Sequence, residues 1–175
     1  MAGVLLSEEG HAQAARLADA LAGVPLAAVI SSPLERAQQT AAPIAARHNL
    51  MVQTDPAVNE IEFGAWTGCR FDELAGPEWD AWNQNRGVAP VPGGETMLAA
   101  QARAMAAVQR WAALYPAGEV AVVSHQDILK AVVALVLGVP LDLLHRFDLG
   151  PASRSVLRIG AGWARIEGIN LGAGC

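Results

Sequence analysis

A histidine stands where a buried strand is predicted to end. Residues 120–123, VAVV, form a short apolar run that leads into Ser124 and His125, and the apolar stretch 128–137 that follows is typical of a helix. A strand followed at once by a helix indicates a parallel sheet, in which ligands bind at the carboxyl ends of the strands. A lone histidine in this place can also simply end a strand, so its neighbours must decide whether it takes part in chemistry.

An arginine follows a second run of the same kind. Residues 26–30, LAAVI, lead directly into residues 31–36, SSPLER. Ser32 is predicted to cap a helix, with a proline in the first helical position and an acid completing a capping box. Arg36 then lies in the first turn, where free amide groups, the positive end of the helix dipole and a guanidinium together favour an anion, phosphate above all. The alternative is an ordinary capped helix with an exposed arginine.

The elements that would position these residues alternate along the chain. A loop over 58–68, VNEIEFGAWTG, holds two carboxylates and two glycines. Around it we expect a helix capped by Ser7, a short strand over 51–54, a helix over 97–114, and a terminal hairpin of 155–159 with 163–166. This order predicts an α/β protein: a three-layer α/β/α sandwich with a mostly parallel sheet and a C-terminal antiparallel hairpin.

The composition excludes several classes of protein. The 175 residues are 53% hydrophobic and 17% charged, which argues against disorder and fits a single domain over 1–170 with a flexible tail at 171–175. A net charge of −5 and the single lysine, Lys130, argue against a nucleic-acid surface. No run has the length of a membrane span, and no signal-peptide pattern follows Met1. Cys69 and Cys175 lack the spacing of metal ligands and form no disulfide framework, which is typical of a cytoplasmic protein. No cluster of His, Asp or Glu has ligand spacing either, so we expect no metal, and we expect no cofactor.

Five short motifs resemble those of one protein family. They are LSEEG at 6–10, SPLERAQQT at 32–40, Asn59-Glu60 followed by Phe63-Gly64, PGGET at 92–96, and VVSH at 122–125. Together and in this order they resemble the histidine phosphatase superfamily, also called phosphoglycerate mutase-like, over nearly the whole chain. The stretches SHQDILKAV and PASRSVLRIG look closest to small bacterial phosphatases of the family, including the α-ribazole phosphatase-like group.

The resemblance implies phosphoryl transfer through a phosphohistidine, most simply the hydrolysis of a small phosphomonoester. Arg36 and His125 would hold the phosphoryl oxygens and stabilise the charge that develops on them, with Ser32 at the same site. Gln126, where the family prefers glycine, would either crowd the phosphate or give it an amide. Glu60 would protonate the leaving oxygen and then activate water. Glu62 is the alternative acid, but the register N-E-x-x-F-G favours Glu60.

The same resemblance limits the expected partners. It implies a small phosphorylated substrate or inorganic phosphate, without a metal or another cofactor, and no nucleic acid or membrane. A phosphoglycerate mutase is disfavoured because the segment between Gly68 and Pro90 is short, whereas the mutases of the family have longer insertions.

The family's nucleophile has no counterpart in the sequence. It is a histidine in an R-H-G motif at the end of a first strand, before the LSEEG stretch, and His11, His48 and His145 lack those surroundings. Two interpretations compete. In the favoured one the chain is a truncated gene model or fragment and is inactive as it stands, because the site residues would otherwise share no reason to occur together. In the other, the protein is a catalytically inactive pseudo-enzyme that binds phosphate or a phosphometabolite.

The absent strand would be central in this fold. We therefore expect its two neighbours to expose unpaired backbone groups inside the sheet, each costing roughly 1–3 kcal/mol. Low stability, or a homodimer that fills the gap, would follow.

Overall fold

The computed structural model describes residues 3–70 and 72–172. The order of the main elements is α1 (Glu8–Ala20), β1 (Leu26–Ser31), α2 (Glu35–Arg47), β2 (Val52–Thr54), α3 (Pro77–Gln84), α4 (Met97–Leu114), β3 (Glu119–Val123), α5 (Gln126–Leu137), β4 (Arg154–Gly160) and β5 (Trp163–Leu171). Short 3-10 helices lie at Pro56–Val58, Gly64–Trp66 and Leu141–Arg146.

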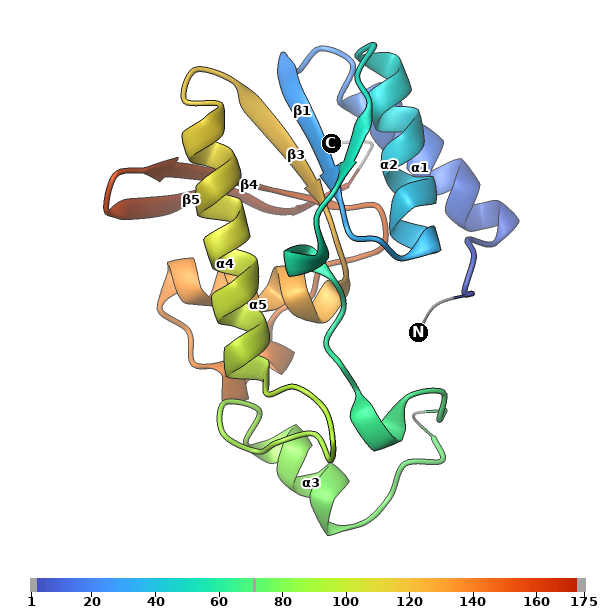
Figure 1. Ribbon diagram of the computed structural model, residues 1–175, viewed down its shortest axis with the longest axis vertical. Helices are drawn as coiled ribbons and strands as arrows, with labels where there is room; N and C mark the ends of the chain where they lie inside the picture. The colour runs from blue at the N-terminus through green and yellow to red at the C-terminus, as the bar shows by residue number, and fades with distance from the viewer. Residues whose placement is uncertain (1–2, 71, 173–175) are drawn as a thin grey trace.

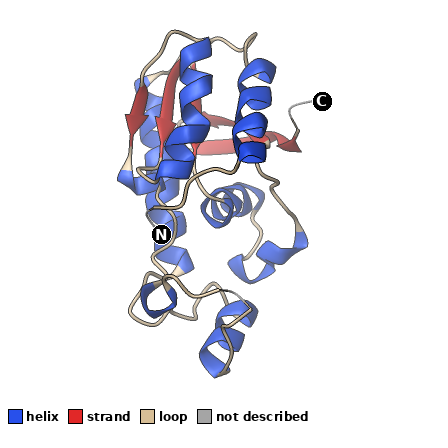
Figure 2. Cartoon of the chain, turned by 90° about the vertical axis from the view of Figure 1, so that its right-hand side faces the viewer, coloured by secondary structure: helices blue, strands red, loops and turns tan. Residues whose placement is uncertain are grey.

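Strand β1 is the centre of a parallel sheet with the order β2-β1-β3. Helices α1 and α2 lie together on one side of this sheet and α4 lies on the other (Figure 1). A separate antiparallel sheet, formed by β4 and β5, packs against α5. Figure 2 shows the helices on both sides of the strands. The predicted α/β class, parallel sheet and C-terminal hairpin are confirmed.

The two strands that lead into the predicted site residues, β1 and β3, pair directly with each other. Ile30 lies opposite Val122 and Ser31 opposite Val123, and the amide of Ser32 donates to the carbonyl of Val123 at 3.0 Å. This pairing places the carboxyl ends of β1 and β3 side by side. In the part of the chain that the structure describes, β3 pairs with β1 alone and β4 pairs with β5 alone, so β3 and β4 each have one edge without a strand partner. The expected low stability, or a homodimer, stays a prediction.

Two apolar clusters hold the elements together. One joins α1, α2 and the parallel sheet through Leu17, Val29 and Ile44. The other joins α3, α4, α5 and the hairpin around Trp82 and Met97. Within 3–70 and 72–172, no helix is long and apolar enough to cross a membrane.

Most element boundaries fall close to the predicted ones. The helix over 97–114 is found as predicted, and Ser7 caps α1 by accepting a hydrogen bond from the amide of Gly10. The terminal hairpin is longer than predicted, because Leu171, assigned to the flexible tail, is the last residue of β5. Residues 173–175 of that predicted tail lie outside the described residues.

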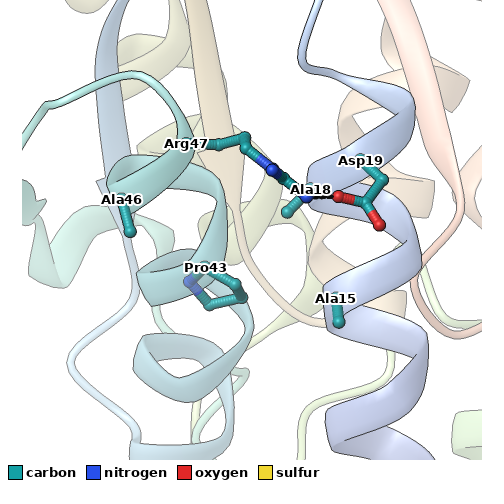
Figure 3. A pocket seen from close by; sticks show the side chains of 6 residues that line it. All are labelled: Ala15, Ala18, Asp19, Pro43, Ala46 and Arg47. Atoms are coloured by element: carbon teal, nitrogen blue, oxygen red, sulfur yellow. Dashed lines mark ion pairs between the residues drawn. The ribbon is translucent and has the colours of Figure 1, made fainter.

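A shallow hollow lies between α1 and α2, far along both helices from their first turns. Its lining consists of Ala15, Ala18, Asp19, Pro43, Ala46 and Arg47. An ion pair between Arg47 and Asp19 bridges the two helices there (Figure 3). The lining is mostly small and apolar, so it offers little to a polar ligand.

Candidate functional site

The site lies where β1 and β3 end and the helices that follow them begin. Ser32 comes directly after β1, and His125 comes just after β3 and is the N-cap residue of α5. Ser32 is fully buried and His125 is 6% exposed. Because the two strands are parallel neighbours, these side chains meet although 93 residues separate them.

The Ser32 hydroxyl connects three segments. It donates to Oδ1 of Asn59 at 3.0 Å, accepts from the amide of Leu34 at 3.2 Å, and lies 2.8 Å from Nε2 of His125. A hydroxyl has one proton to donate, so Nε2 of His125 must be the donor in their bond. The prediction that Ser32 is the N-cap of α2 is wrong, because the helix begins at Glu35 and Leu34 is its N-cap residue. The hydroxyl of Ser32 instead accepts from the amide of Leu34 itself, just before the helix.

Arg36 and His125 are in direct contact. Nη2 of Arg36 lies 3.1 Å from Nδ1 of His125. Arginine cannot accept a hydrogen bond, so Nδ1 is the acceptor and the imidazole is neutral, with its proton on Nε2. Burial, and next the positive charge of Arg36, lower the pKa of His125 from 6.5 to about 3, which agrees with a neutral ring.

The carboxyl of Glu60 completes this group. Its Oε2 lies 3.8 Å from both Nη2 of Arg36 and Nδ1 of His125, and its Oε1 accepts from the amide of Ile61 at 3.1 Å. Burial raises the pKa of Glu60 from 4.5 to about 7, and the charge of Asp127 adds to the increase while Arg36 opposes it. Near neutral pH the carboxyl is therefore poised to give or to take a proton.

The structure brings together three of the predicted catalytic and binding groups, with Ser32 behind them, but not Gln126. The amide of Gln126 donates to the carbonyl of Leu149 at 3.0 Å, and the residue is exposed. Its role in phosphate binding remains a prediction, which this contact weakens. Glu62, the alternative acid, is exposed, and its main-chain groups pair with Glu95.

The loop that carries Glu60, residues 57–68, is called the acid loop here. Its backbone lies against the backbone of the PGGET turn. The amide of Glu95 donates to the carbonyl of Glu62 at 2.9 Å, and the amide of Ala65 to the carbonyl of Pro92 at 2.8 Å. A Cβ atom on Gly94 would lie 2.1 Å from the carbonyl oxygen of Glu62. The glycine is thus required by close approach of the two chains, which explains why this motif accompanies the acid loop.

Sequence reasoning missed the residues that hold this loop in place. Arg103 donates to the carbonyls of three loop residues and forms an ion pair with Glu95. The hydroxyl of Ser124 donates to the carbonyl of Val58 at 2.7 Å. Asp55, which caps the 3-10 helix at the start of the loop, also accepts from the indole of Trp111 at 2.6 Å and from Arg110. Arg103 and Asp55 lie outside every motif, and Ser124, although part of VVSH, shows no sign of this contact, since its partner is a main-chain atom.

The remaining histidines belong to other places in the fold. His11 is exposed in α1, His48 is the C-cap residue of α2, at the opposite end of that helix from Arg36, and His145 is exposed in the 3-10 helix before β4. Within the residues described, no group of three or more His, Cys, Asp or Glu side chains could hold a metal ion.

Comparison with known proteins gives a consistent result. The family described as histidine phosphatase superfamily (branch 1) matches residues 2–172. An uncharacterized Mycobacterium tuberculosis protein, Rv0525, is 44% identical over 136 residues, which cover 71% of this chain and 62% of that protein. The chain therefore spans less than two thirds of the length of this relative.

Two further matches cover almost the whole chain. The adenosylcobalamin/alpha-ribazole phosphatase of Escherichia coli is 29% identical over 168 residues, covering 94% of this chain and 83% of the phosphatase. The structure of a mycobacterial glucosyl-3-phosphoglycerate phosphatase with inorganic phosphate superposes with a TM-score of 0.83 at 29% identity, covering 99% of this chain and 92% of that one.

Proposed function

This chain belongs to branch 1 of the histidine phosphatase superfamily, and from that premise we propose that it acts in the hydrolysis of a small phosphomonoester. One observation carries the proposal: a guanidinium, a neutral imidazole and a proton-exchanging carboxyl lie within 3.8 Å of one another where two parallel strands end. The relatives named above support the substrate class, because they are by name phosphatases of small phosphorylated metabolites.

We assign to Arg36 the binding of the phosphoryl group. Its guanidinium offers paired N–H donors to two oxygens of a tetrahedral anion and balances the charge that develops on them. The first-turn amide groups of α5, which begins at the same place, add further donors and the positive end of a helix dipole. His125 orients Arg36 through Nδ1; once an anion displaces that bond and a proton from solvent is taken up on Nδ1, the imidazolium can donate to a phosphoryl oxygen.

Glu60 is assigned the proton transfers. A carboxyl whose pKa is about 7 is protonated often enough to give a proton to the leaving oxygen. After the leaving group departs, the resulting carboxylate can take a proton from the attacking water. Its place beside Arg36 lets the same carboxyl serve both half-reactions.

The nucleophile is the part of the mechanism that this sequence does not supply in the family's form, since no R-H-G is present. Among the described residues, the contacts at Ser32 and Arg36 include one histidine, His125. That observation favours a second candidate function: binding of phosphate or a phosphometabolite without turnover.

A single comparison separates the two candidates. The chain, and a longer form that begins upstream of Met1 in the same reading frame, are incubated with a panel of phosphomonoesters, and released phosphate is measured. Hydrolysis that is lost in Arg36→Ala and Glu60→Gln supports the first function. Phosphate or vanadate binding that requires Arg36, without turnover in either form, supports the second. Neither binding nor turnover would contradict both.

A further inference from the structure

Every N–H donor of Arg103, on α4, has an acceptor. Nε and Nη2 bind the two carboxylate oxygens of Glu95 at 2.6 and 2.7 Å. Nη1 donates to the carbonyls of Ala57 and Asn59, both at 2.9 Å, and Nη2 also donates to the carbonyl of Glu60 at 3.1 Å. A guanidinium has five N–H groups, and all five donate either to carbonyls of the acid loop or to the carboxylate of Glu95.

These bonds fix the main chain around Glu60 on both sides. Arg103 holds the carbonyl of Glu60 itself and that of the residue before it. Glu95, its ion-pair partner, accepts from the amide of Glu62 at 3.3 Å, while the amide of Glu95 donates to the carbonyl of Glu62 at 2.9 Å. With the chain held before and after Glu60, the direction in which its side chain leaves the backbone is also fixed.

The geometry requires an arginine. A lysine ammonium has three donors on one atom and cannot bind a carboxylate in parallel while reaching three carbonyls in different directions. The positive charge of Arg103 is balanced by Glu95, so the pair holds the loop without adding a net charge beside Glu60.

We propose that Arg103 is a positioning residue for Glu60: by binding the main chain of the acid loop, it holds the Glu60 carboxyl beside Arg36 and His125. The inference rests on the proposed role of Glu60 as the acid of the reaction. It goes beyond that role by naming the residue, outside every motif of the sequence, on which that role depends.

The first test measures where the Glu60 carboxyl lies, whether or not the chain turns over a substrate. The pKa of Glu60 is followed by carbon NMR in the chain with labelled glutamate. Its charged neighbours are Arg36 from α2 and Asp127 at the start of α5, with Arg103 of α4 on its main-chain side; the neutral, titratable ring of His125 also faces it. In Arg103→Lys we expect the pKa to fall from about 7 towards 4.5, because the freed loop lets the carboxyl reach water.

The matched control is Arg158→Lys. Arg158 binds both carboxylate oxygens of Glu167 through Nε and Nη2, as Arg103 binds those of Glu95, but this pair lies on the hairpin of β4 and β5. The pKa of Glu60 should stay at the wild-type value in this control. If Arg103→Lys does not fold, as judged by circular dichroism, Glu95→Gln takes its place. This substitution weakens the ion pair between Arg103 and Glu95 while leaving Arg103 present. If the pKa of Glu60 is unchanged in whichever of these two variants folds, the proposal is overturned.

The second test separates positioning from general damage. A good leaving group needs no proton, whereas a poor one does, and general acid catalysis contributes roughly 10²–10⁴-fold. Arg103→Lys should therefore lower kcat/KM, which reports the leaving-group step and not the later attack of water, by about 100-fold on phenyl phosphate and by less than about 5-fold on 2,4-dinitrophenyl phosphate. Equal losses on both substrates contradict the proposal. If neither the chain nor the longer form hydrolyses either substrate, the proposed function fails, and the Glu60 pKa still decides the role of Arg103.

Discussion

Nη2 of Arg36 and Nδ1 of His125 lie 3.1 Å apart although 89 residues separate them along the chain. The contact exists because β1 and β3 pair in parallel and end together, so the residues that follow them face each other. It also fixes a protonation state, since an arginine can only donate. The site is thus built around a neutral histidine beside a permanent cation. An incoming anion would balance the positive charge of Arg36.

The protonation state of His125 can be observed directly. We expect nitrogen NMR of the unliganded chain to show a proton on Nε2 and none on Nδ1, and the ring to stay neutral down to about pH 4, because burial and Arg36 both lower its pKa to about 3. In Arg36→Met the pKa of His125 should rise, since the second largest of the causes that lower it is removed. Protonation of His125 near pH 6.5 in the wild-type chain is incompatible with the contact described here.

The stability of the fold should depend on pH through Glu60. A carboxyl whose pKa is raised from 4.5 to about 7 on folding binds its proton more tightly in the folded state, so stability is lost as pH rises through this range. At about 1.4 kcal/mol for each tenfold change in proton affinity, this group costs up to about 3 kcal/mol above pH 7. His125, whose pKa is lowered, has the opposite effect between pH 3 and 6.5.

Glu60→Gln isolates the effect, because His125 is present in both proteins. Urea unfolding at pH 5 and pH 8 should show that the variant gains stability relative to wild type on going to the higher pH. Glu62→Gln, an exposed carboxylate two residues away, serves as the control and should follow the wild type. A Glu60→Gln difference that does not change between the two pH values would remove the evidence for a raised pKa.

The close contact at Gly94 predicts a large local cost for a small side chain. Gly94→Ala places a methyl group 2.1 Å from the main-chain oxygen of Glu62, which cannot move without breaking the bond between Glu95 and Glu62. We expect a loss of about 2–4 kcal/mol in the free energy of unfolding. Gly23→Ala, which meets no atom within 4 Å, should change stability little. Comparable stability of the two variants would show that the two loops do not touch as described.

The sequence was sufficient to predict those residues of the site that come directly after strands. Apolar runs leading into polar residues predicted β1 and β3, and the rule that ligands bind at the ends of parallel strands predicted that Arg36 and His125 would meet. The helix over 97–114 was also predictable, because alanine-rich periodicity and a following Tyr-Pro step mark its length and its end. The pairing of β1 with β3 was not, since sequence patterns indicate strands but not their neighbours.

The residues that support the site were beyond sequence reasoning for a physical reason. Three of the five hydrogen bonds of Arg103 go to carbonyl oxygens, which every residue has, and its carboxylate partner Glu95 lies outside the helix, so no local pattern reveals the contact. Ser32 was assigned to helix capping because its local pattern fits that role, and the tertiary bond with His125 overrides the pattern. Local signals compete with contacts between distant segments, and the sequence alone does not show which one prevails.

The account depends most on Arg36 holding a tetrahedral anion, and vanadate binding measures this directly. Loss of paired, charge-assisted hydrogen bonds should weaken vanadate binding by about 10- to 100-fold in Arg36→Lys. Arg16→Lys on α1, which removes an exposed arginine paired with Glu9, should bind vanadate as the wild type does. Equal affinity of all three proteins for vanadate, or no binding by the wild-type chain, would contradict the assignment of this site.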